Sequence, residues 1–336
     1  MTTVHEVRLA QVPARAVCAE DFEVAEAGAV PELTDGHVLV GIRRLGLNAG
    51  LANRIGGSDT AYGPGIGVGD VPASDAVVEV LASASDEYQV GELAVRTSPW
   101  RDVDVAVPDE LRRIPQPDDD IPLEAYLTVL GHVGFTAYTG LVHVGEVRGE
   151  DVVFVSGAAG GVGSCAVQLA KARGARVIGS AGSAEKVELL TEELGADAAF
   201  NYHDGEADEL LRAATPEGID LYFDTVGGDQ LDAALGALRY RGRVVICGAS
   251  SQYGSHGERR GPANYTQMIY QELTMRGFTV TDHEDLRSGF EDEVGELVRA
   301  GTVRSLHTVL EGFQRIPEAF AALLAGGHSG RVIVSV

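Results

Sequence analysis

Three glycines at G-x-x-G-x-x-G spacing are the residues of this chain whose pattern points most directly to chemistry. Gly157, Gly160 and Gly163 follow the apolar run Asp151 to Ser156 (DVVFVS) and open a helical pattern. Glycine suits such a turn because it tolerates positive φ, leaves room for a diphosphate and lets the helix pack closely on the strand. Free amides at a helix start attract phosphate. The spacing therefore predicts a dinucleotide site, the alternative being a tight strand–helix connection without a ligand.

The end of the next strand indicates which dinucleotide is bound. A site for NAD usually places Asp or Glu there to accept hydrogen bonds from the ribose hydroxyls. This chain reads VIGSAGS at Val177 to Ser183 and then Lys186, with no carboxylate in that run. A hydroxyl and a positive charge can hold an extra 2′-phosphate, so Ser183 and Lys186 favour NADPH over NADH. The alternative is that Lys186 is a solvent-facing helix lysine.

From Asp151 onward, apolar strands alternate with helices. This pattern predicts a parallel sheet covered on both faces. The predicted strands are 151–156, 175–180, 198–201, 219–224, 243–247 and 276–280. Beyond them the sequence predicts a helix over 285–300, a strand over 306–311, a helix over 317–325 and a last strand over 331–336. The fold class is therefore α/β, with a Rossmann doubly wound sheet.

Before residue 122 the chain has short β-like runs broken by Gly, Pro and Asp, which predict a smaller antiparallel domain. Examples are 37–42, 74–81 and 92–96. A chain of 336 residues is also long for one hydrophobic core. We expect residues 1–122, completed by 304–336, to form one domain, and residues 123–303 to form the cofactor domain.

Composition narrows the classes of partner. The net charge of −24 removes the attraction that drives non-specific binding to nucleic acid or to an anionic membrane surface. No apolar run approaches the roughly 20 residues that a membrane span requires, and the N-terminus lacks the apolar core of a signal peptide. The cysteines are few and scattered, at Cys18, Cys165 and Cys247. We therefore expect a cytoplasmic protein with reduced thiols, acting on a small molecule.

The same cysteines argue against a metal site. Tetrahedral zinc requires thiolate or imidazole ligands at short spacings, and often a lobe of four cysteines. Neither those cysteines nor the histidines at 132, 143 and 328 form such a set. We therefore expect no metal and no Lewis-acid alcohol oxidation.

Over nearly its whole length the sequence resembles the zinc-independent medium-chain reductases, the branch that contains prostaglandin reductase, leukotriene B4 dehydrogenase, alkenal double-bond reductase and curcumin reductase. The resemblance rests on GFTAYTGL (134–141), SGAAGGVGS (156–164), GSAEK (182–186), FNY (200–202), YFDTVGG (222–228), VVICGASSQY (244–253) and IYQEL (269–273). It implies a GroES-like substrate domain around an inserted Rossmann domain, and a homodimer.

The resemblance also implies site residues. With Ser183, the expected NADPH contacts are Gly160, Gly161, Val162, Gly163, Lys186, Tyr202, Thr225, Cys247, Gly248, Ala249, Ser250, Tyr253, Phe278, Thr279, Val280 and His328. Thr225 and His328 depart from the family, which has asparagine at both places. The run Leu47 to Arg54 also lacks the family's Asp-Pro, which leaves the substrate side least defined.

Without a metal, the reaction that needs least help from the protein is hydride delivery to a carbon–carbon double bond already polarised by a carbonyl, as in enals and enones. A tyrosine suits the developing enolate oxygen because its phenol stays protonated at neutral pH. Tyr270 is the first candidate because it matches the family tyrosine that faces the substrate, and Tyr253 is the second. Alternatives are a quinone oxidoreductase, a trans-acting enoyl reductase of specialised metabolism, and an NADPH-binding sensor without catalysis.

Overall fold

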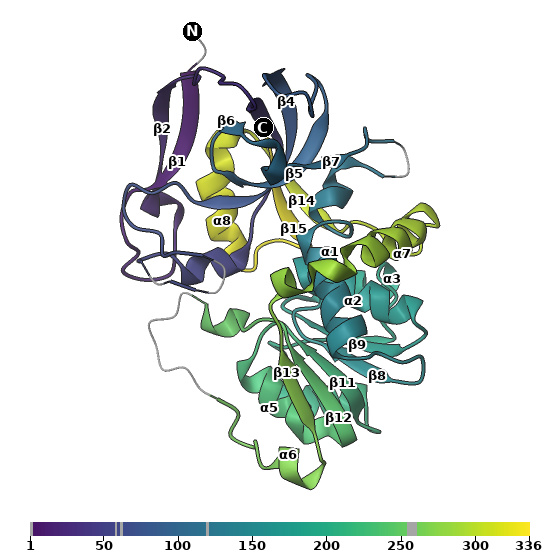
Figure 1. Ribbon diagram of the computed structural model, residues 1–336. Helices are drawn as coiled ribbons and strands as arrows, with labels where there is room; N and C mark the ends of the chain where they lie inside the picture. The colour runs from purple at the N-terminus through teal and green to yellow at the C-terminus, as the bar shows by residue number, and fades with distance from the viewer. Residues whose placement is uncertain (1–2, 58, 61–62, 119–120, 254–260) are drawn as a thin grey trace. The chain divides into compact units, whose positions relative to one another are not determined.

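A six-stranded parallel sheet forms the centre of residues Thr128–Leu306 (Figure 1). Its strands lie in the order β10-β9-β8-β11-β12-β13. The first strand, β8, is central; β9 and β10 are added on one side of it, and β11, β12 and β13 on the other. The strands are β8 (Val152–Val155), β9 (Arg176–Ala181), β10 (Ala198–Asn201), β11 (Ile219–Asp224), β12 (Leu238–Ile246) and β13 (Thr274–Gly277). This is the doubly wound order that places ligands at the carboxyl ends of the strands.

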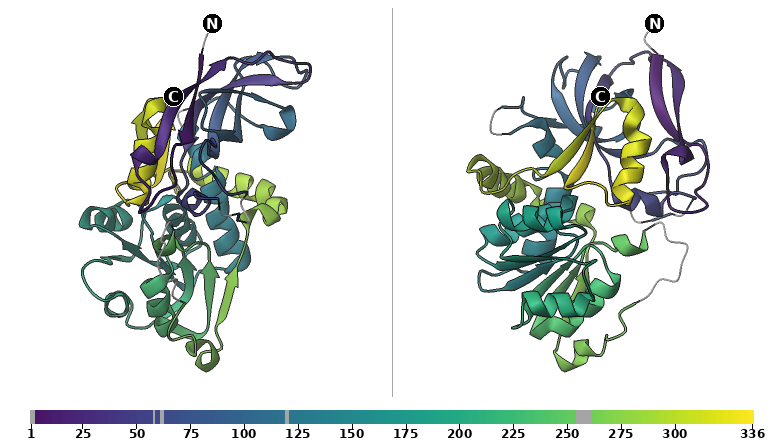
Figure 2. Two further views of the ribbon diagram at one scale, coloured as in Figure 1. Left: turned by 90° about the vertical axis from the view of Figure 1, so that its left-hand side faces the viewer. Right: turned by 180° about the vertical axis from the view of Figure 1, so that it is seen from behind.

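Helices cover both faces of this sheet (Figure 2). All four residues of β8 are buried, which explains why its sequence is a continuous apolar run and not an alternating one. One core cluster joins Phe154 to Leu211 and Ala234, which lie on α4 (Ala207–Ala214) and α5 (Gly228–Ala237). The other helices of this unit are α1 (His132–Tyr138), α2 (Gly161–Ala172), α3 (Ala184–Glu192), α6 (Gln267–Tyr270) and α7 (Arg287–Arg299).

The second unit combines the start and the end of the chain, Met1–Leu127 and His307–Val336. Its seven-stranded sheet has the order β14-β15-β3-β4-β5-β7, with β6 paired to β3, and β1 and β2 form a separate two-stranded sheet. The C-terminal strand β15 lies antiparallel to β3, with Ile333 opposite Gly46. The last strands therefore complete a sheet that the first hundred residues begin.

The strands of this unit are β1 (Thr3–Leu9), β2 (Phe22–Ala29), β3 (Val38–Gly46), β4 (Ala73–Ser83), β5 (Leu93–Pro99), β6 (Val103–Ala106), β7 (Arg112–Ile114), β14 (His307–Glu311) and β15 (Arg331–Ser335). Its core contains the fully buried Trp100, whose ring centre lies 5.6 Å from Phe22 and 5.5 Å from Phe320. Phe320 belongs to α8 (Ile316–Leu324). The predicted fold class, a Rossmann sheet with a GroES-like β-rich domain, is confirmed.

The structure is a computed structural model that describes residues 3–57, 59–60, 63–118, 121–253 and 261–336. The boundaries expected after residues 122 and 303 fall inside the first and second unit respectively, close to their limits. Within the described ranges, every helix is too short or too polar to cross a bilayer.

Candidate functional site

The glycine-rich loop after β8 has a shape that only glycine permits. Gly157 has φ +57°, and a Cβ there would lie 2.6 Å from Thr225 Oγ1. A Cβ on Gly163 would lie 2.2 Å from the carbonyl oxygen of Gly157, which is backbone and cannot swing aside. Gly160 is the N-cap of α2, and no side chain caps that helix start. The loop thus brings a helix start close to the strand without covering it, as a diphosphate site requires.

The segment after β9 and the segment after β10 meet beside this loop. Ser183 is the N-cap of α3, and its hydroxyl accepts a hydrogen bond from the Lys186 backbone N–H at 3.3 Å. Burial lowers the pKa of the Lys186 amine. A Cβ on Gly182 would lie 2.7 Å from the hydroxyl of Tyr202. The structure therefore gathers Ser183, Lys186 and Tyr202, three residues expected to hold a 2′-phosphate.

A buried carboxylate organises the loop after β11. Asp224 is 1% exposed, and its Oδ1 accepts hydrogen bonds from the backbone N–H groups of Val226 at 2.9 Å and Gly227 at 2.7 Å. The Tyr222 hydroxyl donates to the same oxygen at 2.8 Å, and the Ser156 hydroxyl at 3.2 Å. Burial raises the pKa of the Asp224 carboxyl, and the hydrogen bonds from its neighbours counteract that rise.

This network reaches the adjacent strands. The Ser156 hydroxyl accepts the Thr225 N–H at 3.0 Å, and the Thr225 hydroxyl donates to the Ser156 carbonyl at 2.7 Å. Thr225 thus ties its loop to the glycine-rich loop after β8. The motif YFDTVGG identified this loop in the sequence. The sequence did not indicate that the hydroxyls of Ser156 and Tyr222 would both donate to the carboxylate of Asp224.

The loop after β12, expected to contact the cofactor from Cys247 to Tyr253, folds back on the same network. The N–H groups of Cys247 and Gly248 donate to the carbonyl of Asp224 at 2.9 and 3.0 Å. Burial raises the pKa of the Cys247 thiol to about 12, which keeps it protonated and non-nucleophilic. The Tyr253 hydroxyl accepts the Ala249 N–H at 3.1 Å.

Phe278, Thr279 and Val280 follow the end of β13, so they also lie at the carboxyl edge of the sheet. A Cβ on Gly140 would lie 2.6 Å from Cε2 of Phe223 and 3.0 Å from Cζ of Phe278. Gly140 belongs to a π-helical turn, Thr139–Val144, a geometry often found at functional sites. The sequence analysis did not predict this π-helical turn.

Tyr270 lies elsewhere. It ends α6, directly before β13, and β13 runs parallel to β12. Its position is therefore the amino end of the sheet, opposite the loops above (Figure 1). Its side chain is 68% exposed. Within one chain, the order of α6 and β13 keeps Tyr270 away from these loops. Its role as a catalytic residue stays a prediction.

His328 belongs to the other unit, between α8 and β15. Its Nε2 is buried and has no hydrogen-bond partner among the residues that the structure describes. Such an atom can accept or donate a hydrogen bond to a bound molecule. The contact with NADPH expected for His328 stays a prediction.

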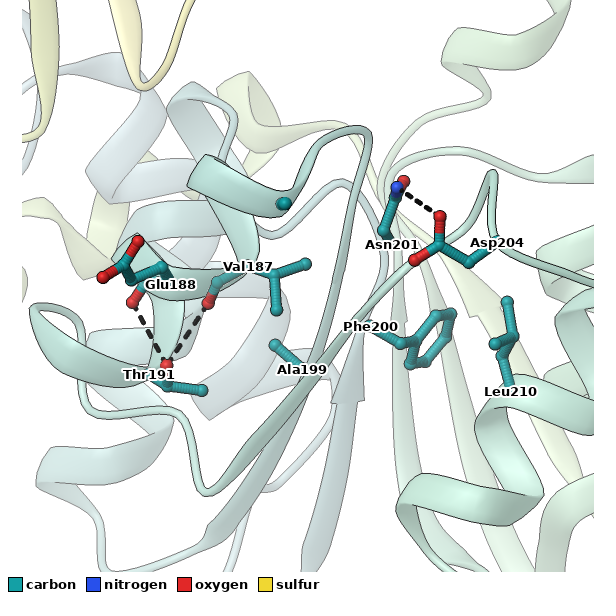
Figure 3. Close-up of a pocket in the computed structure, with 9 residues that line it drawn as sticks. Val187, Glu188, Thr191, Ala199, Phe200, Asn201, Asp204 and Leu210 are labelled. Atoms are coloured by element: carbon teal, nitrogen blue, oxygen red, sulfur yellow. Dashed lines mark hydrogen bonds between the residues drawn. The ribbon is translucent and has the colours of Figure 1, made fainter.

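A cavity of about 470 Å³ opens beside β10, between α3 and α4 (Figure 3). Its lining combines apolar side chains such as Phe200 with the carboxylates of Glu188 and Asp204. Two carboxylates repel phosphate, so this cavity is not the diphosphate site. Among the described residues, no three His, Cys, Asp or Glu side chains are grouped so that they could hold a metal ion.

The residues at the carboxyl edge thus fit an NADPH molecule. The uncapped start of α2 and its glycines leave space and N–H groups for a diphosphate, and Ser183, Lys186 and Tyr202, which are expected to contact the 2′-phosphate, lie on the two neighbouring loops. Ser250, Thr279 and Val280 lie on the remaining loops of that edge.

The contact of Gly163 with backbone predicts a severe effect of one methyl group. We expect Gly163→Ala to lower the free energy of unfolding by about 2–3 kcal/mol, because the Cβ forces the helix start away from Gly157. Gly289→Ala, where a Cβ meets nothing within 4 Å, is the matched control. Urea unfolding of both variants measures the effect, and equal stabilities would contradict the close packing.

The Asp224 network predicts a graded response. We expect Asp224→Ala to lower the free energy of unfolding by about 3 kcal/mol, because buried donors lose their acceptor. Asp224→Asn keeps one acceptor oxygen and should lose less. The exposed Asp229→Ala is the control, with an expected change below about 0.5 kcal/mol. Equal losses in the Ala variants of Asp224 and Asp229, by thermal or urea unfolding, would exclude a central role for the buried carboxylate.

Comparison with known proteins agrees with this geometry. Residues 161–294 match the family model described as zinc-binding dehydrogenase, and residues 5–114 match the N-terminal domain of oxidoreductase. The chain is 31% identical to the NADPH-dependent curcumin reductase of Escherichia coli, covering 98% of this chain and 95% of that protein. It is 35% identical to the (+)-pulegone reductase of Mentha piperita, covering 91% and 90%.

The structure is also similar to the crystal structure of CurA in complex with NADPH from Vibrio vulnificus. The TM-score is 0.92 at 29% identity, and the match covers 99% of each chain. These matches extend over both units and confirm the resemblance found in the sequence. The chain belongs to the medium-chain dehydrogenase/reductase family, within its zinc-independent branch of reductases.

Proposed function

We propose that this chain, by its family an NADPH-dependent oxidoreductase, reduces the α,β carbon–carbon double bond of small or medium carbonyl compounds such as enals and enones. Relatives named as reductases of pulegone and curcumin support this reaction class. The bound cofactor supplies the hydride. The protein must hold that cofactor, orient the alkene and stabilise the enolate oxygen that develops on the carbonyl.

The observation that carries the proposal is the position and hydrogen bonding of Tyr253. Its hydroxyl accepts the Ala249 N–H, so its own proton remains available for donation. Burial raises its pKa, so the phenol keeps that proton at neutral and mildly alkaline pH. A protonated hydroxyl on the loop after β12 is suited to donate to an enolate oxygen.

The cofactor is held by residues with separate tasks. The N–H groups at the start of α2 receive the diphosphate, and Lys186, Ser183 and Tyr202 receive the 2′-phosphate. Asp224 keeps the loops after β8, β11 and β12 in one arrangement. Residues Phe278 to Val280 are expected to lie beside the nicotinamide ring of the cofactor.

Tyr270 enters this scheme through a second copy of the chain. β13 is an edge strand of the sheet, and Thr274, Arg276 and Gly277 on it are exposed. Two such edges can pair antiparallel about a two-fold axis. Antiparallel pairing brings the amino end of β13 in one copy, with its neighbour Tyr270, to the carboxyl end of β13 in the other. We therefore place Tyr270 in the partner's site of a homodimer.

The exposed apolar side chains beside that edge support the homodimer. Ile269 is 72% exposed and Tyr265 is 62% exposed in the isolated chain. Exposed apolar groups around an open strand edge mark an interaction surface. We place the reaction in the cytoplasm, in keeping with the three free cysteines.

We expect purified protein to oxidise NADPH when an enal or enone is added, followed by absorbance of the reduced cofactor. Tyr253→Phe should lower kcat about 10- to 100-fold with little change in NADPH affinity, because one hydrogen bond to the enolate is lost. Tyr222→Phe, whose hydroxyl is buried in the Asp224 network, serves as a control for fold damage.

Product analysis separates the alternatives in that assay. A saturated carbonyl product supports the proposal, whereas quinol formation without enone turnover indicates a quinone oxidoreductase. Turnover only of carrier-bound enoyl substrates indicates a trans-acting enoyl reductase. Tight NADPH binding with no acceptor at all indicates a sensor and overturns the proposed catalysis.

Hybrid dimers test the placement of Tyr270. Tyr270→Phe and Tyr253→Phe subunits, each nearly inactive alone, should recover about a quarter of wild-type activity when unfolded together and refolded as an equal mixture. The reason is that half of the dimers are hybrids, each with one intact site and one doubly defective site. If Tyr270 acted within its own chain, the mixture would stay as inactive as its parents.

A further inference from the structure

His203 lies beside the residues that receive the 2′-phosphate, and the pairing of two strands places it there. β9 and β10 are parallel neighbours with Asn201 opposite Ala181. The Tyr202 N–H donates to the Ala181 carbonyl at 3.0 Å, so the alignment continues past the end of the strands. Tyr202 thereby meets Gly182, and His203 follows it in the turn that the Asp204 N–H closes on the Asn201 carbonyl.

The imidazole of His203 packs on the ring of Tyr202. The ring centres are 4.3 Å apart with planes inclined at 51°. The His203 backbone N–H donates to Asn201 Oδ1 at 3.2 Å, which holds the turn. His203 is exposed, and the neighbouring Tyr202 is 39% exposed. An anion on the Tyr202 hydroxyl is therefore within the range of this imidazole.

The charged groups around His203 leave it available to a phosphate. Asp204 accepts a hydrogen bond from Asn201 Nδ2 at 2.8 Å (Figure 3). Glu185, at the start of α3, is engaged by its own backbone N–H and the Ser183 hydroxyl, which lower the pKa of its carboxyl. Lys186 on α3 is a positive neighbour, and Glu206 is the N-cap of α4. Asp204 and Glu185 thus have hydrogen-bond partners of their own.

We propose that His203 is a further specificity-determining residue for the 2′-phosphate of NADPH. The inference rests on the proposed function and deepens it. An imidazole N–H can donate a hydrogen bond to a phosphate oxygen. A ring that packs on Tyr202, whose hydroxyl is expected to contact the same phosphate, can add that bond without moving the turn that carries it.

Adenosine 2′,5′-bisphosphate and adenosine 5′-monophosphate isolate this subsite from hydride chemistry. Calorimetry on the full chain should show the bisphosphate binding about 10-fold more weakly to His203→Ala than to the wild type, the effect of one hydrogen bond to a charged group. The monophosphate should bind both proteins with the same affinity. His203→Lys, which keeps a donor at this position, should retain most of the wild-type affinity for the bisphosphate.

His37→Ala is the matched control, because His37 lies in a turn of the other unit with Thr34 as its partner. It should bind the bisphosphate as the wild type does. Wild-type affinity for the bisphosphate in His203→Ala, or an equal loss of affinity for the monophosphate, overturns the role of His203 while NADPH binding and turnover persist. Absence of NADPH binding in the wild type would instead overturn the proposed function. Should the Ala variant fail to fold, His203→Leu gives the same comparison.

Discussion

One buried carboxylate connects the loops on which the proposed chemistry depends. Oδ1 of Asp224 receives two backbone N–H groups from its own loop and hydroxyls from Tyr222 and Ser156. Its carbonyl receives two more N–H groups from the loop after β12. Burying a carboxylate without a cationic partner is costly, and only such dense hydrogen bonding offsets the cost. The hydrogen bonds of Asp224 therefore fix the loops after β8, β11 and β12 relative to one another.

That arrangement explains why a residue expected to contact the cofactor can differ from the family without disturbing the loops. Thr225 stands where the family has asparagine, yet its hydroxyl is used to tie two loops and its backbone N–H meets Ser156. The frame depends on backbone groups and on Asp224, so this substitution leaves it intact. The contribution of residue 225 to cofactor contact can change without changing the loop that carries it.

The order of strands and helices in the Rossmann unit could be predicted from the sequence because buried parallel strands are apolar throughout and their helices carry one apolar stripe. Strands β10 and β11 match their predicted ranges, 198–201 and 219–224. β13 begins at Thr274 and ends at Gly277, two residues before the predicted start and three before the predicted end at 280, and Val280 already belongs to a 3-10 helix. The β1–β2 sheet was not predicted, since β2 is largely exposed and has little apolar alternation.

The site could be predicted only in part. The glycine spacing and the missing carboxylate indicated the dinucleotide, because each of these signals lies within a short continuous segment of the sequence. Tyr270 became a candidate through the family resemblance alone, since a residue that precedes a strand of a parallel sheet lies at the amino end of that sheet. Asp224, Ser156 and Tyr222 become one network only when β8 and β11 align, and Tyr202 meets Gly182 only through the register of β9 with β10.

Lysine is nearly absent from this chain: 24 of its 26 basic residues are arginine, and the two lysines are Lys171 and Lys186. Lys171 is paired with Asp197 at 2.8 Å. Burial lowers the pKa of the Lys186 amine. An arginine keeps its charge in any surroundings, whereas the charge of a lysine responds to desolvation. The basic side chains of this chain are therefore almost all insensitive to burial, and the position expected to contact the coenzyme phosphate carries a basic group whose charge depends on its surroundings.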